Sequence, residues 1–233
     1  QNRKLRYRFK RSEANHVSYS INNIFGPTIQ GEGALQGTPC IFLRFSKCNL
    51  WSGLEKDRAT AACRICDTDF ASGVQMSADE IVETFETYKD EAEWIVISGG
   101  EPLLQLDDEL IGRLQNMGWK INLETNGTLP LPLMKYNYNQ QLQTYFGKSK
   151  LDHISFSPKT KRNSIKLREC DSLKILWPTY DHLIDEYDNY PAKHKYLQPT
   201  DQGKGFNKKI LNRLFELQGW KLSPQLHKLI GVM

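Results

Sequence analysis

The sequence predicts an α/β fold whose sheet is largely parallel and is either open or curled into a partial barrel. Short apolar segments with many β-branched residues alternate with amphipathic segments of helical period from about residue 17 onward. This order of strands and helices is typical of parallel α/β proteins. Polar and glycine-rich groups also follow the ends of several expected strands, which is where such folds place an active site.

Seven segments have the short, branched and aromatic composition that predicts strands. One of them contains the run LKILW, which we interpret as a buried strand without a further role. A final short extended piece is expected at residues 225–232. The seven strands are expected at residues 17–25, 40–46, 93–102, 119–127, 151–159, 171–178 and 193–200.

Four segments have the period of amphipathic helices. The first begins at Ser77, a typical N-cap residue, and Glu80 three residues later completes a capping box. The second ends at Gly118, a residue type common at helix C-termini. Residues 129–150 show no clear pattern. The expected helices cover residues 77–89, 107–118, 180–190 and 205–220.

The chain of 233 residues is expected to form a single domain at 17–233, preceded by a basic segment at 1–16. Six of its 31 Lys and Arg residues lie among the first eleven, which leaves 25 basic against 27 acidic residues in the rest. A nucleic-acid surface would need basic residues spread over the body, so nucleic acid is not an expected partner. Leu5, Tyr7 and Phe9 alternate with charges, so the basic segment fits either an edge strand or an RNA-binding arm.

The cysteine content and hydropathy favour a reducing compartment. Five cysteines are too few for a disulfide scaffold of this length. The chain has no apolar run of about 18 residues and no signal-peptide pattern, so no membrane association is expected. We therefore expect a cytoplasmic protein.

Four groups of polar and glycine residues lie where expected strands end. The carboxyl ends of parallel strands meet at one edge of a sheet, so these groups are expected to share a pocket. The Gly99–Gly100 turn in such a pocket would offer backbone groups to a ligand that contains a zwitterionic amino acid. Glu101 is placed to pair with the ammonium of that ligand. The groups are Ser98 to Glu101, Glu124 to Gly127, Ser157 to Lys159 and Gln198 to Asp201.

Three cysteines, Cys48, Cys63 and Cys66, lie in the segment 46–70, which we interpret as a metal-binding loop. Thiolates suit zinc and iron–sulfur centres. A closed zinc site needs a fourth ligand from far along the chain, such as His153, His182, His194 or Cys170. A 4Fe–4S cluster on three cysteines instead leaves one iron open to S-adenosylmethionine (SAM). Cys40 and Cys170 are expected in the core.

Eight motifs together resemble the 7-carboxy-7-deazaguanine synthases, a family of radical SAM enzymes, from about residue 18 to the C-terminus. The GGEP run is common to radical SAM proteins, whereas QGEG, CDT and the terminal LHK are specific to this family. Fourteen residues separate the first two cluster cysteines, as in a subset of the family with an expanded cluster loop. The motifs are GPTIQGEG (26–33), FLRFSKCNLW (42–51), CRICDTDF (63–70), ISGGEPLLQ (97–105), ETNGT (124–128), SFSPK (155–159), LQPTD (197–201) and QLHKLIGV (225–232).

The resemblance implies an incomplete TIM-like barrel of the radical SAM type. It also implies conversion of 6-carboxy-5,6,7,8-tetrahydropterin to 7-carboxy-7-deazaguanine with loss of ammonia, in deazapurine biosynthesis of the queuosine type. The implied cofactors are a 4Fe–4S cluster, SAM and Mg2+. The implied partners are the pterin substrate, a flavodoxin- or ferredoxin-type electron donor and a second copy of the chain.

The resemblance further assigns the site residues. Cys48, Cys63 and Cys66 would hold the cluster, and Thr68 would give Mg2+ the hard oxygen that it prefers. A carboxylate at Glu32 suits the N–H groups of a pterin, and Arg44 suits the substrate carboxylate. The substrate set is Ile29, Gln30, Gly31, Glu32, Arg44, Ser98, His227 and Met233. The SAM set is Ile65, Cys66, Asp67, Gly100, Glu101, Ser157, Lys159, Gln198, Pro199, Thr200 and Asp201.

Two alternatives and one departure from the family remain. A radical SAM enzyme that generates a glycyl radical on a protein partner would share the cysteines and GGEP but would not need QGEG. A zinc-stabilised protein that docks RNA through residues 1–11 would need neither GGEP nor QGEG. The departure is Lys47, which stands before Cys48 where the family typically has glycine, and its side chain is expected to affect the cluster or its electron donor.

Overall fold

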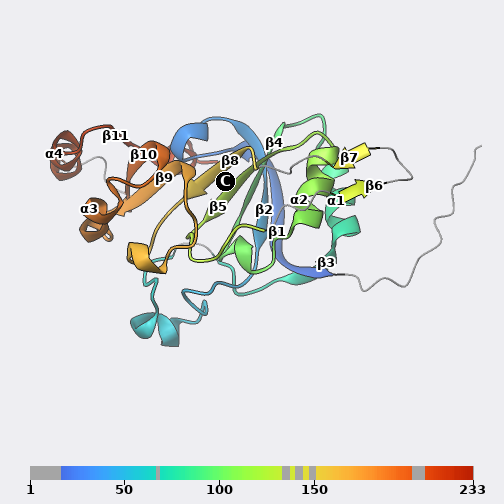
Figure 1. Cartoon of the computed structure of the whole chain (residues 1–233), viewed down its shortest axis with the longest axis horizontal. Helices are drawn as coiled ribbons and strands as arrows, with labels where there is room; N and C mark the ends of the chain where they lie inside the picture. The colour runs from blue at the N-terminus through green and yellow to red at the C-terminus, as the bar shows by residue number, and fades with distance from the viewer. Residues whose placement is uncertain are drawn as a thin grey trace, which may run out of the picture.

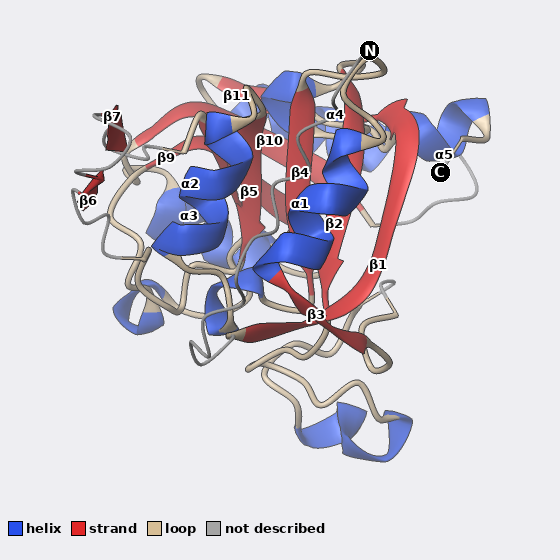
Figure 2. Cartoon of the chain, turned by 90° about the vertical axis from the view of Figure 1, so that its right-hand side faces the viewer, coloured by secondary structure: helices blue, strands red, loops and turns tan. Residues whose placement is uncertain are grey.

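The computed structural model describes residues 17–66, 69–132, 137–139, 144–146, 151–200 and 208–232. Their main feature is a nine-stranded sheet in the order β11-β10-β9-β8-β5-β4-β2-β1-β3. The sheet is curved but has two separate edges, β11 and β3, so the barrel is incomplete (Figures 1 and 2). This arrangement agrees with the predicted α/β fold.

The seven neighbouring strands β11, β10, β9, β8, β5, β4 and β2 pair in parallel. The last two strands of the sheet, β1 and β3, form an antiparallel edge. The short link 30–38 between β1 and β2 explains this edge, because a parallel pair would need a long crossover. Two further strands, β6 and β7, pair only with each other. The bounds are β1 Ser18–Ile29, β2 Pro39–Phe45, β3 Val74–Ser77, β4 Trp94–Gly99, β5 Lys120–Thr125, β6 Asn137–Asn139, β7 Thr144–Phe146, β8 His153–Phe156, β9 Cys170–Trp177, β10 Ala192–Pro199 and β11 Trp220–Leu222.

Helices cover the outer face of the sheet (Figure 2). The predicted capping box is confirmed, since the Ser77 hydroxyl accepts from the Glu80 N–H and the Glu80 carboxylate accepts from the Ser77 N–H. Asp107 caps the second helix through the Leu110 N–H. The helices are α1 Ala78–Glu86, α2 Asp108–Asn116, α3 Ile184–Tyr187, α4 Lys208–Glu216 and α5 Leu226–Ile230. The 3-10 helices are Gly33–Leu35, Glu55–Thr60, Pro102–Leu104, Arg162–Ser164 and Asp181–Leu183.

The alternation of side chains along β2 separates the core from the inner face of the sheet. Ile41, Leu43 and Phe45 are fully buried and belong to the cluster that packs beneath α1 and α2. Phe42 and Arg44 lie between them in sequence and point to the opposite face. The face opposite the core can therefore carry polar groups such as Arg44.

The last part of the chain differs from the sequence prediction. Residues 225–232, expected to be extended, form the short helix α5, which ends at Gly231 in the left-handed conformation. The edge position of the sheet is taken instead by β11, which pairs with β10. Leu226 donates its N–H to the Gly31 carbonyl at 2.9 Å, which holds α5 against the link between β1 and β2.

Lys47 adopts a backbone conformation that normally favours glycine. Its φ is 73°, and no other non-glycine residue in the described ranges has a positive φ. The Lys47 N–H donates to the Phe70 carbonyl at 3.1 Å, and its carbonyl accepts from the Glu101 N–H at 2.9 Å. The side chain is exposed. Hydrogen bonds on both sides of the residue thus hold a lysine where the family pattern has glycine.

We expect Lys47→Gly to raise the free energy of unfolding by roughly 0.5–1 kcal/mol, as measured by urea denaturation. Glycine avoids a left-handed strain of about 1–2 kcal/mol but loses part of this gain to its freedom in the unfolded chain. Lys56→Gly, in the 3-10 helix of the same loop, is the control and should not stabilise the protein. A destabilised Lys47→Gly variant would mean that the lysine side chain itself holds the loop.

Candidate active site

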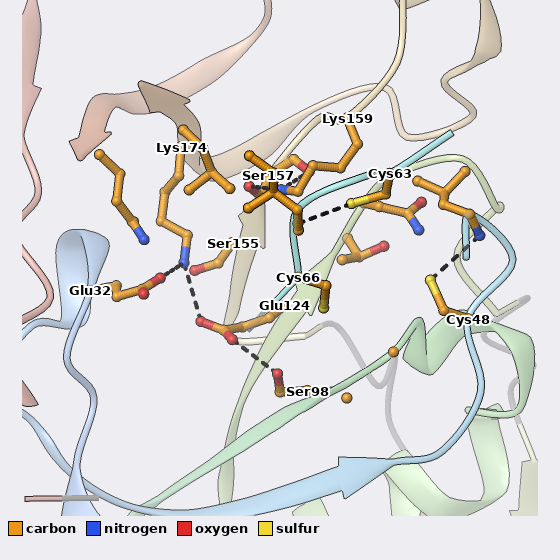
Figure 3. A pocket seen from close by; sticks show the side chains of 18 of the residues that line it. Glu32, Cys48, Cys63, Cys66, Ser98, Glu124, Ser155, Ser157, Lys159 and Lys174 are labelled. Atoms are coloured by element: carbon orange, nitrogen blue, oxygen red, sulfur yellow. Dashed lines mark hydrogen bonds and ion pairs between the residues drawn. The ribbon is translucent and has the colours of Figure 1, made fainter. Parts of the chain in front are cut away.

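The described residues enclose a cavity of about 310 Å³ on the inner face of the sheet. Its walls come from the ends of β4, β5, β8, β9 and β10, from the loop 46–70 and from the segment after β11 (Figure 3). We call it the central cavity. All four predicted strand-end groups contribute to it. Its lining residues are Glu32, Cys48, Leu50, Trp51, Cys63, Ile65, Cys66, Phe70, Ser98, Gly99, Gly100, Glu124, Thr125, Asn126, Ser155, Ser157, Lys159, Lys174, Leu176, Gln198, Pro199, Thr200 and Gln225.

Cys48, Cys63 and Cys66 all line the central cavity. Among the described residues, no three His, Cys, Asp or Glu side chains converge closely enough to hold a single metal ion. A zinc site needs such convergence, whereas in a cubane cluster each thiolate binds a different iron. Three free thiols around one cavity fit a 4Fe–4S cluster, in which each thiolate binds a different iron.

Two of the three cavity cysteines also receive hydrogen bonds from the protein. The Leu50 N–H donates to the Cys48 sulfur at 3.5 Å, and the buried Tyr180 hydroxyl donates to the Cys63 sulfur at 3.5 Å. The remaining cysteines, Cys40 and Cys170, are buried as expected, and burial raises the pKa of each thiol to about 12. Their burial agrees with the expected place of these two thiols in the core.

The loop 46–70 begins where the glycine turn after β4 touches the end of β2. Gly100 donates its N–H to the Phe45 carbonyl at 3.2 Å. A Cβ on Gly99 would overlap the Phe45 backbone, and one on Gly100 would overlap the Lys47 carbonyl. Only glycines allow this approach, which brings Cys48 to the cavity wall.

Glu101 is fully buried behind this wall, and protein donors engage both of its oxygens. One oxygen accepts from the Thr125 hydroxyl at 2.8 Å and the Leu103 N–H at 3.0 Å, and the other from the Asn126 N–H at 2.7 Å. Burial raises the pKa of Glu101, and the N–H donors only partly oppose this effect. Glu101 thus ties the β4 turn to the β5 turn, and its predicted pairing with the SAM ammonium stays a prediction.

A buried lysine joins two carboxylates at the opposite end of the central cavity. The Lys174 ammonium lies 2.6 Å from Glu32 Oε2 and 3.3 Å from Glu124 Oε1, and the lysine side chain is only 5% exposed (Figure 3). Gln225 donates to the second Glu32 oxygen at 2.7 Å. Burial alone raises the pKa of Glu32, but Lys174 outweighs it and lowers that pKa to about 2.

Lys174 is the site residue that the sequence interpretation missed. The run LKILW is indeed the buried strand β9, but Lys174 turns its side chain into the central cavity, so a purely structural interpretation of the run was wrong. The available signal was the charged residue itself, because a lysine inside an apolar strand needs a buried partner.

Glu124 also accepts from two predicted substrate residues. The Gln30 amide donates to Glu124 Oε1 and the Ser98 hydroxyl donates to Glu124 Oε2, each at 3.1 Å. The sequence placed Glu124 only in one of the strand-end groups. In the structure it is the common acceptor of Gln30 after β1, Ser98 on β4 and Lys174 on β9.

The predicted SAM residues line the side of the central cavity near the cysteines. Lys159 donates to the Ser157 carbonyl at 3.1 Å and also to the Ser157 hydroxyl. Burial lowers the pKa of Lys159. Gln198 is buried in the wall, and its side-chain oxygen has no hydrogen-bond partner among the described residues. The members of the set that line the cavity are Ile65, Cys66, Gly100, Ser157, Lys159, Gln198, Pro199 and Thr200.

Several predicted substrate residues lie beside the cavity lining. Arg44 is the register partner of Ser98, so both side chains leave the same face of the sheet, and its guanidinium lies over the Phe25 ring. His227 lies so close to Gly31 that a Cβ there would overlap the imidazole. Ile29 ends β1 next to Gln30. The predicted Asp67, Thr68, Asp201 and Met233 fall outside the described residues.

Comparison with known proteins identifies relatives over nearly the whole chain. The radical SAM superfamily matches residues 57–172. The 7-carboxy-7-deazaguanine synthase of Bradyrhizobium diazoefficiens is 35% identical over 93% of this chain and 100% of its own. The enzyme of the same name from Bordetella pertussis is 34% identical over the same shares. The crystal structure of QueE from Escherichia coli covers 91% of this chain and 96% of its own, with a TM-score of 0.62 and 22% identity, which supports the fold.

We expect Glu101→Gln to lower the free energy of unfolding by about 2 kcal/mol in urea denaturation. The amide keeps the size of the side chain but turns an NH2 group toward buried donors, which leaves a polar pair unsatisfied. Glu93→Gln is the control, because Glu93 makes an exposed ion pair with Lys120, of a kind that contributes less than about 1 kcal/mol. Equal losses in the two variants would contradict the tying role of Glu101.

Proposed function

The chain belongs to the 7-carboxy-7-deazaguanine synthase family of radical SAM enzymes, and from this premise we propose how the central cavity divides the work. The cysteine end would hold the cofactors, and the Glu32 end would hold 6-carboxy-5,6,7,8-tetrahydropterin. The product would be 7-carboxy-7-deazaguanine, formed with loss of ammonia. The observation that carries the proposal is one cavity lined by three thiols and by the QGEG carboxylate.

At the cofactor end, Cys48, Cys63 and Cys66 would bind a 4Fe–4S cluster with one iron left for SAM. The reduced cluster would supply the electron that cleaves SAM to the radical that abstracts a substrate hydrogen. The cavity side chains would hold SAM in place. Gly100 offers backbone groups, Lys159 and Ser157 offer polar side chains, and the unpartnered Gln198 oxygen is free to accept from a bound ligand.

At the substrate end, Glu32 would accept hydrogen bonds from the amino-pyrimidine edge of the pterin. Gln30 and Ser98 approach the same region through Glu124. Arg44 and His227 would bind the substrate carboxylate, and Thr68 would provide an oxygen ligand to Mg2+. Closing both ends around the substrate would keep water away from the radical.

Anaerobic turnover tests this function directly. The iron-reconstituted, reduced protein is incubated with SAM, Mg2+ and carboxytetrahydropterin, and products are identified by mass spectrometry. We expect a SAM-dependent product that has lost ammonia. An intact pterin, despite a formed cluster and slow release of 5′-deoxyadenosine, would leave the radical chemistry in place and overturn the substrate assignment.

Replacement of Glu32 separates substrate binding from radical generation. Glu32→Ala should reduce pterin turnover by at least about 100-fold, because the pterin donors and Lys174 both lose their acceptor. Slow release of 5′-deoxyadenosine without substrate should persist. Glu216→Ala, on the exposed helix α4, is the control. Full pterin turnover by Glu32→Ala would show that the QGEG carboxylate does not bind the substrate. The glycyl-radical alternative receives no support from the named relatives.

The partners and compartment remain proposals. We propose a homodimer, and the exposed apolar residues Leu229, Ile230 and Val232 at the C-terminus offer a surface for it. A flavodoxin- or ferredoxin-type donor would approach the loop 46–70, whose 3-10 helix projects from the body (Figures 1 and 2). Among the described helices, none is long and apolar enough to cross a membrane. All five cysteines are free, which supports a reducing, cytoplasmic setting.

A further inference from the structure

Lys174 occupies a position that neither the cluster chemistry nor substrate contact explains. It lies on β9, more than 140 positions from Glu32 in sequence, and its ammonium contacts Glu32 and Glu124 together. The ammonium and the Glu32 side chain are both buried, at 5% and 15% exposure. A buried pair of this kind has little solvent screening, so removal of one partner strongly affects the other.

The pairing fixes which kind of hydrogen bond Glu32 can make. An ionised carboxylate has only acceptor oxygens, whereas a protonated one also carries an O–H donor. Lys174 bonds one oxygen of Glu32 and Gln225 donates to the other, and both contacts favour the ionised form. The remaining lone pairs of Glu32 thus present an acceptor-only edge to the central cavity.

We propose that Lys174 is a specificity-determining positioning residue, which holds Glu32 as an acceptor-only carboxylate and so selects a ring edge with two adjacent donors. The inference rests on the proposed function, since a pterin carries such an edge in its 2-amino group and N3–H. A lumazine carries a 2-oxo group in place of the amino group and would face the Glu32 oxygens with an acceptor. Two facing acceptors cannot hydrogen-bond to each other, so the mismatch costs binding free energy.

Other charged groups around the pair set the background for any pH dependence. His227 on α5 and Lys159 after β8 both interact electrostatically with Glu32. The Lys174 charge also lowers the pKa values of Lys159 and His153. These groups are common to the wild type and to Lys174 variants. A ratio of affinities for two ligands, measured on one protein at one pH, therefore removes most of their contribution.

The test compares equilibrium binding of 6-carboxypterin and 6-carboxylumazine to the iron-reconstituted protein with SAM and Mg2+, from pH 8 to pH 5.5. The wild type should prefer the pterin by roughly 10- to 100-fold. Its ratio should stay flat with pH, because the Glu32 pKa of about 2 lies far below this range. In Lys174→Met, burial and the neighbouring Glu124 raise the pKa of Glu32, so Glu32 takes up a proton as the pH falls. The pterin preference should then shrink to within about threefold at pH 5.5.

Three further variants make the outcome decisive. Lys174→Arg keeps the cation and should retain the pterin preference. Glu32→Gln places a donor in the cavity while Lys174 itself is retained, and it should lose the pterin preference at every pH. This variant keeps the test valid if Lys174→Met folds poorly. Lys195→Met removes the partly buried lysine that contacts Asp188 and is the matched control with unchanged ratios.

The possible failures are distinguishable. A wild type that binds neither ligand would overturn the proposed function itself. A wild type that prefers the pterin, together with a Lys174→Met ratio that stays flat with pH, would overturn the role of Lys174 alone. Retention of the pterin preference by Glu32→Gln would show that an acceptor-only edge is not what selects the ligand.

Discussion

The close approach of the β4 turn to the end of β2 is the constraint on which the site depends. Gly99 and Gly100 have no Cβ, so their backbone can lie directly against Phe45 and Lys47. The hydrogen bond from the Glu101 N–H to the Lys47 carbonyl then fixes the residue that precedes Cys48. Because Glu101 also binds the β5 turn, Cys48 is positioned relative to two strand ends.

The central cavity has two chemically different ends. Sulfur and a lysine of lowered pKa lie at one end, where a cluster and a charged sulfonium ligand would be bound. The other end contains two carboxylates and one buried ammonium. One excess negative charge there suits a ring edge rich in N–H donors. Arg44, paired in register with Ser98, and His227, packed against Gly31, lie beside the same end, where they would bind the substrate carboxylate.

The sequence was sufficient for the parts of the fold that local chemistry determines. The capping box at Ser77, the strand pattern and the glycine turns all depend on neighbouring residues, and the structure has them where they were expected. The helix α5 was expected as an extended segment because its stability comes from contact with Gly31, about 195 positions earlier, which no local pattern records.

The candidate site also divides into residues that a local pattern identifies and residues that only the fold brings together. The Cys63–Cys66 pair and the GGEP turn are each confined to a few residues, and the resemblance to the family added Cys48, so these residues could be proposed before the structure. Lys174 could not, since its role depends on β9 lying across the inner face from Glu32 and on Glu124 reaching it from β5. A charged residue in an apolar strand predicts only that some partner exists.

The C-terminal segment completes the cavity by fixing the shape of the QGEG loop. The Ser223 hydroxyl accepts from the Gly33 N–H at 2.9 Å, and the Pro224 carbonyl accepts from the Gln36 amide at 2.8 Å. Gln225 then reaches Glu32 itself. These contacts follow directly after β11, so the segment that leaves the last strand of the sheet holds the loop that presents Glu32. The QGEG loop and the C-terminal segment thus lie together in the fold although about 190 residues separate them in sequence.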